Sequence, residues 1–262
     1  MRRIAAIAVN TFREAIRNKI LYALLFFAVA LILASIAVAR LSLHEEIRVV
    51  EDLGLAAISL FAILIAVFVG VNLVYKELER KTVYVIIPKP LHRWEFLVGK
   101  LLGTVMTLSV LMVVMAVVFF GVLVVMGGEV RVVLVKALWL FFMEVLVISA
   151  VALFFSSFSS PFLSGLFTLL IFMVGRLTPE IRIFLPRIQD KALSLLTRSV
   201  LSLVPDLNLF SVSGATVGGR WVSIHGEFVS WLYVGKATAY GLFYASVVLL
   251  LAMAIFRKRD FI

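Results

Sequence analysis

The chain has 262 residues, of which 63% are hydrophobic and 15% are charged, and its formal net charge is +10. Because a soluble domain is roughly half apolar, this composition excludes an ordinary soluble domain and indicates a membrane protein. The basic excess is better explained by residues that flank membrane spans and face anionic lipid than by nucleic-acid binding, so no nucleic-acid partner is expected. The chain has no cysteine, which excludes disulfides, thiolate metal sites and cysteine nucleophiles.

Residues 1–20 predict an amphipathic helix ahead of the first long apolar run. With 3.6 residues per turn, Ile4, Ala8 and Ala15 share one face of this helix. The opposite face is polar and includes Arg13. A basic helix of this kind can lie in the membrane interface. The alternative is a solvated helix that contacts a cytoplasmic partner.

Six later stretches are candidates for helices that cross the ~30 Å hydrocarbon core, which takes about 20 residues. The first two are separated by a charged loop at 40–52, and the fourth and fifth by a serine-rich turn at 156–161. The alternation of apolar and polar residues that is typical of a membrane β-barrel is missing. The six predicted spans are Leu21–Ala39, Leu55–Val74, Leu101–Met126, Leu134–Phe155, Phe162–Gly175 and Ala237–Phe256.

The distribution of lysine and arginine predicts the orientation of these spans, because basic residues favour the cytoplasmic side of short connections. With the N-terminus inside, most basic residues near the spans fall on the cytoplasmic side. The two short outer connections then carry only Arg40, Arg48, Arg131 and Lys136. We therefore expect an all-α polytopic membrane protein with six transmembrane helices, both termini in the cytoplasm, and a single transmembrane domain over residues 1–262.

A charged insert at 75–100 separates the second and third spans and is predicted to be cytoplasmic. Its first half can continue the second span as a helix, and its last residues can lead into the third. Pro88 and Pro90 break the helix between them, because proline lacks an N–H donor and disfavours helix in the residue before it. The insert is thus predicted to form a protruding elbow that a partner on the cytoplasmic side can bind.

The elbow combines charged residues with an aromatic anchor, which is a combination that docking surfaces favour. Trp94 is the aromatic candidate, although it could equally be an interfacial belt residue. The residues predicted to contact a partner are Glu77, Glu79, Arg80, Lys81, Pro88, Pro90, Arg93, Trp94 and Glu95.

Glu144 is an acidic residue predicted to lie deep within a span. A charge at the centre of a membrane helix costs roughly 2.5–3.5 kcal/mol on insertion scales, so its presence needs a reason. It could line a transport path, become protonated, or pair with Arg176 or Lys136 near the outer end of the spans.

Neither a metal site nor a catalytic site is expected. The histidines His44, His92 and His225 are far apart in the sequence and do not form a ligand cluster. Met112 and Met115 share a face of the third span, which could suggest passage of a soft metal, but apolar packing is the simpler interpretation. No serine–histidine–acid set is indicated by spacing, so the chain is not predicted to be an enzyme.

The segment at 176–235 is predicted to lie outside the cytoplasm and is long for a connection. Leu196 and Val200 belong to one face of a helix that should lie on the membrane surface or dip into it. The second half of the segment is rich in glycine and is predicted to form turns. Trp221 and Trp231 are expected to anchor at the interface, or to contact an extracytoplasmic partner.

Several short motifs follow one another along the chain in a recognisable order. The insert carries E-x-E-R-K-T at Glu77–Thr82, I-P-K-P-L-x-R at Ile87–Arg93 and E-F-L-V-G-K-L-L-G at Glu95–Gly103. The other motifs are F-R-E-A-I-R-N-K-I-L-Y at Phe12–Tyr22, F-S-S-F-S-S-P at Phe155–Pro161, V-P-D-L-N-L-F at Val204–Phe210 and F-R-K-R-D-F at Phe256–Phe261. Their order, together with six spans, resembles the permease subunits of type-2 ABC exporters, and the nearest subgroup is the permease of the nitrous-oxide-reductase maturation system.

The resemblance implies a permease subunit in the cytoplasmic (inner) membrane of a prokaryote. ATP and Mg²⁺ would be bound by a separate cytoplasmic ATPase subunit, and this chain would hold no cofactor. The sequence agrees, because it contains no G-x-x-x-x-G-K-[ST] phosphate loop. Two permeases, the second being another copy or a paralogue, would assemble with two ATPases in the lipid bilayer.

In such an assembly the elbow at 75–100 would dock on the ATPase, and the turn at 156–161 would make a smaller contact. The function expected from the resemblance is export coupled to ATP hydrolysis. Two alternatives remain open at this point. One is a non-transport scaffold that passes the conformational change of an ATPase to an extracytoplasmic partner, and the other is a secondary transporter.

Overall fold

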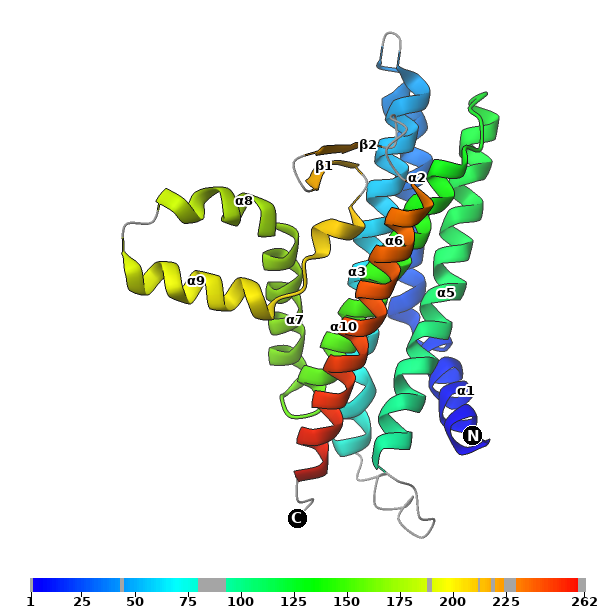
Figure 1. Ribbon diagram of the computed structural model, residues 1–262. Coiled ribbons are helices and arrows are strands. Elements are labelled where there is room, and N and C mark those ends of the chain that lie inside the picture. Colours follow the sequence, from blue (N-terminus) through cyan, green and yellow to red (C-terminus); the bar gives the residue numbers. More distant parts are fainter. Residues whose placement is uncertain are drawn as a thin grey trace.

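The computed structural model describes residues 2–42, 45–79, 93–187, 190–211, 213–217, 220–223 and 230–258. It shows a bundle of long helices from which a shorter helical arm projects to one side (Figure 1). The long helices are α2 (Lys19–Ala39), α3 (Glu46–Glu79), α5 (Arg93–Val125), α6 (Val132–Ser156) and α10 (Trp231–Lys258).

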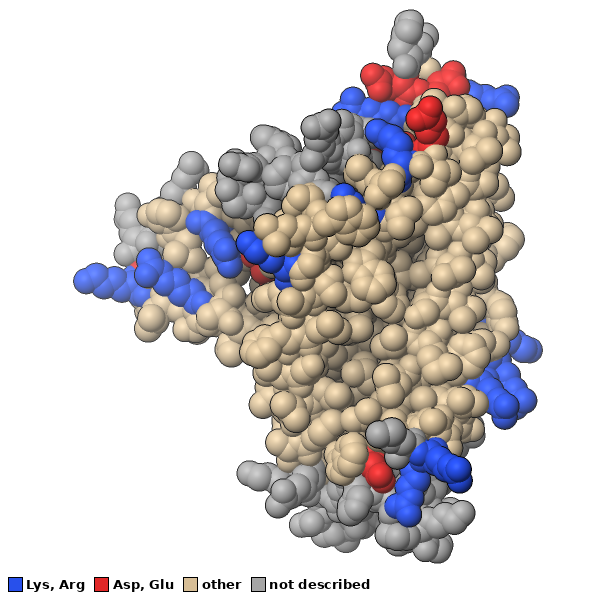
Figure 2. Space-filling view, turned by 45° about the vertical axis from the view of Figure 1, so that its right-hand side comes forward, with Lys and Arg blue, Asp and Glu red and all other residues tan. Residues whose placement is uncertain are grey.

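These five helices are long and apolar enough to cross a membrane. A sixth crossing requires that α7 (Pro161–Arg176) and α8 (Thr178–Phe184) count as one span, although the chain bends by 62° between them. Figure 2 shows a broad face of uncharged side chains, with charged groups at its upper and lower ends and further Lys and Arg side chains on the projection at the left and on the right-hand edge. A multi-pass α-helical membrane protein is therefore confirmed, whereas six complete spans and cytoplasmic termini stay predictions.

The beginning of α3 differs from the prediction. The charged loop expected at 40–52 is shorter, because α3 starts at Glu46 and includes Glu51 and Asp52. Glu46 lies in the first turn, where the helix dipole favours an acidic side chain. Glu51 is buried and forms an ion pair with Arg131 at the start of α6. Most of these charges thus belong to a helix end rather than to a loop.

The buried core lies mainly along α3 and α6, which are covered over most of their length. By contrast, α2, α5 and α10 turn most of their apolar side chains outward, where lipid would solvate them. Gly70 lets the two central helices approach closely, because an added Cβ there would lie 2.5 Å from the Cβ of Ala152. Small residues at helix contacts are a common means of packing in membrane proteins.

The first helix, α1 (Arg2–Ile16), packs along the first turns of α5, at the end of the bundle that also holds the C-terminal end of α10 (Figure 1). Gly103 of α5 lies in this contact, because an added Cβ would lie 2.5 Å from the Cβ of Thr11 and 2.6 Å from the carbonyl oxygen of Ala8. The face expected to be apolar is the one that packs, since Ala8 and Ala15 are buried. Its position in the membrane interface stays a prediction.

After α7 the chain forms the lateral arm, which consists of α8, the 3-10 turn η1 (Leu185–Arg187) and α9 (Lys191–Leu203). The carboxylate of Asp190 caps α9 by accepting a hydrogen bond from the N–H of Ala192 at 2.9 Å. No residue of α9 is buried. The apolar face predicted for this helix is therefore exposed in the chain, and its contact with lipid stays a prediction.

A short antiparallel hairpin lies between the arm and α10 and adds two strands to the all-α expectation. It pairs Thr216 with Trp221, and its register shifts between Ser213 and Ala215. The glycine-rich composition predicts turns here but does not predict that strands pair. The elements of this part are η2 (Leu207–Phe210), β1 (Ser213–Val217) and β2 (Arg220–Ser223).

Three tyrosines of α10 hold the segment at 203–209 against the bundle through their hydroxyl groups. Each of them bonds to a backbone group between the end of α9 and η2, so the main chain is fixed in place there. The contacts are Tyr233 donating to the carbonyl of Leu209 at 2.5 Å, Tyr244 donating to the carbonyl of Leu203 at 2.8 Å, and Tyr240 accepting from the N–H of Asp206 at 2.9 Å.

Candidate functional site

Arg176 is the last residue of α7 and stands where the chain bends into α8. Pro161 occupies the first turn of α7, where its missing N–H costs no hydrogen bond, and the apolar residues that follow carry the helix up to Arg176. A cation is favoured at this end by the helix dipole. In Figure 1 α7 ends well below the upper ends of α2 and α5.

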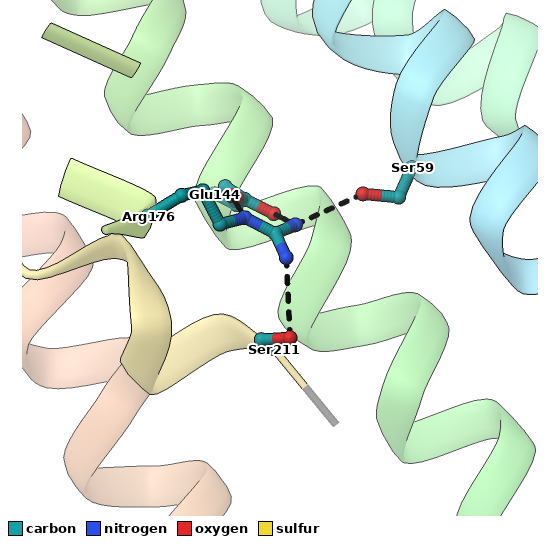
Figure 3. A network of polar contacts seen from close by, with 4 residues as sticks. All are labelled: Ser59, Glu144, Arg176 and Ser211. Atoms are coloured by element: carbon teal, nitrogen blue, oxygen red, sulfur yellow. Dashed lines mark hydrogen bonds and ion pairs between the residues drawn. The ribbon is translucent and has the colours of Figure 1, made fainter. Parts of the chain in front are cut away.

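Arg176 binds Glu144 of α6 through two parallel hydrogen bonds (Figure 3). The distances are 2.7 Å from Nε to Oε1 and 2.7 Å from Nη2 to Oε2. The Glu144 side chain is fully buried, and that of Arg176 is 26% exposed. The sequence left Arg176 and Lys136 open as partners of Glu144. The structure shows Arg176, whereas the Nζ of Lys136 lies 4.6 Å from the centre of the Trp231 ring.

The same guanidinium also bonds to two hydroxyl groups. Its Nη2 donates to the Oγ of Ser59 on α3 at 3.0 Å, and its Nη1 donates to the Oγ of Ser211, just after η2, at 3.1 Å (Figure 3). The ring of Phe172 lies 5.8 Å from the guanidinium carbon. Arg176 therefore links its own helix, α7, to α3, to α6 and to the residue after η2. The ion pair that it forms with Glu144 carries no net charge.

An open cavity of about 430 Å³ lies beside this network. Its size falls within the range of small-molecule sites, which is roughly 300–1,000 Å³. Arg176, Ser59 and Ser211 line it together with mostly apolar side chains, which include Phe141 and Phe172. Glu144 is not among the lining residues. The cavity thus borders Arg176 and the two serines rather than Glu144.

The predicted partner-binding elbow is described only at its two ends. Glu77 and Glu79 lie in the last turns of α3, and Arg93 is the first residue of α5. The other four charged or proline candidates fall outside the described residues, and their role stays a prediction. These are Arg80, Lys81, Pro88 and Pro90.

Trp94 and Glu95 lie in the first turn of α5. The Trp94 side chain is 48% exposed, and that of Glu95 is partly buried. The helices that lead into and out of the insert, α3 with 34 residues and α5 with 33, are unusually long. At 1.5 Å per residue each spans roughly 50 Å, well beyond a ~30 Å hydrocarbon core.

The structure does not cover the histidines that were considered as metal ligands. His44, His92 and His225 lie outside the described residues, so the prediction that they hold no metal is not tested. Within the described ranges, no group of three His, Cys, Asp or Glu side chains is placed to hold a metal ion. Met112 and Met115 are both buried in the main apolar core, which agrees with a packing role.

Sequence reasoning did not identify Ser59 or Ser211 as parts of the site. Serines are frequent in apolar helices and often bond to the backbone of their own helix, so no periodic pattern marks the two that bind a charge. The one sequence feature that could have indicated a polar site here was Arg176 itself. A basic residue that ends a short apolar stretch needs partners that accept hydrogen bonds, and serine hydroxyl groups are among the acceptors that this chain offers.

Scans of the chain against protein-family models and against curated proteins find no match. The resemblance to type-2 ABC permeases therefore depends on the order of the sequence motifs, and the function that follows from it is a proposal.

Proposed function

We propose that the chain is the membrane-spanning permease subunit of an ATP-binding cassette transporter of the type-2 kind, and that it works as an exporter. A separate cytoplasmic ATPase hydrolyses ATP with Mg²⁺, and this chain itself holds no cofactor and catalyses no reaction. The chain acts as a dimer with a second copy or a paralogue in the cytoplasmic membrane of a prokaryote.

The observation that supports this proposal best is the pair of long helices that bracket the motif-bearing insert. Both α3 and α5 are about 20 Å longer than a hydrocarbon core requires, by 1.5 Å per residue. On the side of the bundle where α1 lies, α3 continues past the predicted end of the second span at Val74 to Glu79, and α5 begins at Arg93, ahead of the predicted start of the third span at Leu101. Trp94, at the start of α5, is about half exposed.

The packing also suggests how force on the insert would reach the spans. Because α1 lies against the glycine face of α5, the two helices would move as one body when the insert moves. The close contact at Gly70 would pass the motion of α3 to α6. The bound nucleotide would then bias two states that differ by rigid-body movement of the helices.

Affinity purification of the full chain from its native membrane tests the proposal directly. We expect an ATPase subunit to co-purify and ATP hydrolysis to depend on the complex. Charge reversal by Glu79→Lys or Arg80→Glu, or removal of the aromatic ring by Trp94→Ala, should lower ATP-driven transport without affecting membrane insertion.

Trp231→Ala is a matched control for the aromatic variant, because Trp231 is 69% exposed and begins α10 at the other end of the bundle. It should leave coupling unchanged. The proposal fails if no ATPase accompanies the chain and ATP has no effect. If an ATPase is present but all three variants keep full coupling, the insert is only a connection.

A secondary transporter is the second candidate, because the structure contains two features that such proteins use. One is the buried pair of Glu144 and Arg176, and the other is the 62° break between α7 and α8. Transport into ATP-free proteoliposomes that is driven by an ion gradient would favour this candidate over the first. In either case, full transport by Glu144→Gln would exclude the carboxylate from the transport path.

A further inference from the structure

We propose that the cavity beside Arg176 binds an amphipathic molecule with an apolar body and an uncharged head that accepts hydrogen bonds, such as an ester, an amide or an ether. The inference deepens the proposed function and rests on it in one respect, since such a molecule would be the cargo of the transporter. Binding itself requires no ATPase and is therefore measurable on this chain alone.

The walls of the cavity suit an apolar body. Phe141 and Phe172 line it, and its rim includes Leu60, Met173 and Leu177. The three rim side chains are 51%, 57% and 50% exposed, respectively. The cavity is therefore open along apolar residues of α3 and α7, both of which belong to the candidate membrane-crossing part of the chain. A hydrocarbon chain can enter it from the bilayer without crossing a polar surface.

The polar end of the cavity offers hydrogen-bond donors. A guanidinium has five N–H groups, and four contacts use those of Arg176, two to Glu144 and one each to Ser59 and Ser211. One N–H on Nη1 is left without an acceptor among the described residues. Both serine oxygens accept from Arg176, and within the same residues their own hydroxyl hydrogens have no acceptor. A ligand head that accepts hydrogen bonds would satisfy these three donors.

The charge balance selects an uncharged head. Glu144 already neutralises Arg176 at 2.7 Å, so an anionic head would share the guanidinium with a fully buried carboxylate and be repelled by it. A cationic head would face the guanidinium, which lines the cavity while the carboxylate does not. Like charges placed together at a binding site are strongly unfavourable. An uncharged head that accepts hydrogen bonds is repelled by neither Glu144 nor Arg176.

Photolabelling of the purified full chain in lipid nanodiscs tests the inference. The probe is a monoacylglycerol with a diazirine in its acyl chain, and labelled peptides are mapped by mass spectrometry. We expect labels on the rim residues of α3 and α7. Three competitors share the same 18-carbon chain and differ only in the head. Monoolein should displace the probe at a concentration about tenfold lower than oleate or oleylamine at neutral pH.

Variants of the residues that line the cavity provide a second test. Ser59→Ala and Ser211→Ala each remove one donor and should weaken monoolein binding by about two- to tenfold, as expected for one hydrogen bond. Leu60→Trp fills the rim at an exposed position that should tolerate the change, so it remains informative even if a serine variant folds poorly. Ser149→Ala is the matched control, because Ser149 is buried on α6, bonds to the carbonyl of Val145 and does not line the cavity.

The outcomes separate the inference from the proposed function. Labels spread over the lipid-facing helices, equal competition by oleate and monoolein, or wild-type labelling of both Leu60→Trp and Ser211→Ala would each overturn the inference. If the cavity is labelled as expected but no ATPase partner exists, the inference stands and the proposed function fails. If an ATPase partner is found and the cavity is not labelled, the proposed function stands alone.

Discussion

Glu144 can be accommodated inside the bundle because Arg176 covers both of its oxygens with hydrogen bonds. Removing two charges from water is costly, and a well-packed apolar pair in their place is often neutral or stabilising. Stability alone is therefore a weak reason for this pair. Its geometry is a better one, because the planar guanidinium joins α6, α7 and α3 at one point while Arg176 also lines the cavity.

Arg176→Gln should be more destabilising than Glu144→Gln, because it leaves a fully buried carboxylate without its charge partner. The expected loss is about 3 kcal/mol, at the lower end for broken buried pairs, since Arg176 is partly exposed. Replacing both residues, by Glu144→Leu with Arg176→Met, should recover most of the loss. Unfolding in detergent of the wild type, the single variants Glu144→Leu and Arg176→Met and their combination closes a double-mutant cycle, and the two glutamine variants are measured beside them. Additive effects would contradict a coupled pair.

Asp206 is a partly buried acid that lies outside the helices that could cross the membrane. Burial raises the pKa of its carboxyl above the ordinary value of 3.8, while the charge of Arg182 and a hydrogen bond from the backbone of Asn208 oppose the rise. Arg182 is 60% exposed and lies 3.6 Å away, so its effect is weakened by solvent. The protonated form is therefore the one that the folded state favours, relative to the unfolded chain.

The stability contributed by protonation of Asp206 should be fully present below the unfolded pKa and be lost as pH rises through the higher folded pKa. Melting temperatures of the wild type and Asp206→Asn, measured from pH 7 down to pH 4, should show the wild type gaining relative to the variant as pH falls. In Arg182→Gln the opposing charge is gone, so the gain should begin at a higher pH. A constant difference between wild type and Asp206→Asn would show that the folded state does not perturb this group.

The residue-scale contacts were predictable only in part. Glu144 was recognisable because a charge stands out in an apolar span, and Arg176 was one of two partners within reach of it along the sequence. Ser59 and Ser211 were not recognisable, because their role depends on which helix faces Arg176. That depends on packing between segments more than 30 residues apart, as the separation of 32 between Arg176 and Glu144 illustrates.

At the scale of single elements, the contact of α1 with α5 shows most clearly how the positions of glycines allow two helices to pack closely. Gly99 and Gly103 are four residues apart and therefore share one face of α5, where they make room for the backbone of α1. The amphipathic pattern of α1 predicted which of its faces would be covered. It did not predict that a helix rather than lipid would cover it.

Gly103→Ala should loosen α1, because the added Cβ would lie 2.6 Å from the carbonyl oxygen of Ala8. The expected cost is about 1–3 kcal/mol, as for other overpacked contacts. Gly121→Ala in the same helix is the matched control, since an added Cβ there meets nothing within 4 Å. It should be neutral, or slightly stabilising through helix propensity.

The lack of native cysteine makes this measurement simple. A Thr11→Cys background places one thiol in the contact between α1 and α5, where Thr11 is fully buried. Maleimide should react slowly with this thiol alone and quickly when Gly103→Ala is added. Equal rates in the Gly103→Ala and Gly121→Ala backgrounds would show that the glycine is not what holds α1.

Elements with strong periodicity or length were predictable, and those that depend on pairing were not. The apolar length of α6 predicted its bounds to within two residues at each end. The predicted start of α3 was wrong, because Glu51 and Asp52 resemble loop residues until the ion pair between the buried Glu51 and Arg131 is known. The hairpin of β1 and β2 was missed, because its glycines indicate turns and its strands are only five and four residues long.

For the whole molecule, the orientation in the membrane is the prediction with the widest consequences. Single cysteines introduced by Arg48→Cys and Glu129→Cys should react with a membrane-impermeant maleimide in intact cells, since both positions are exposed at the end opposite α1. Arg13→Cys and Trp94→Cys should react only after the membrane is opened. The reverse pattern would place the insert outside and remove any cytoplasmic partner from consideration.

The tyrosines of α10 have a consequence for how this protein can change over generations. Their hydroxyl groups bind the main chain at Leu203, Asp206 and Leu209, and every residue except proline offers the same backbone N–H and carbonyl groups. Substitutions along 203–209 can therefore accumulate without detaching the segment. We expect relatives to differ in the outer surface of this region while retaining Tyr233, Tyr240 and Tyr244.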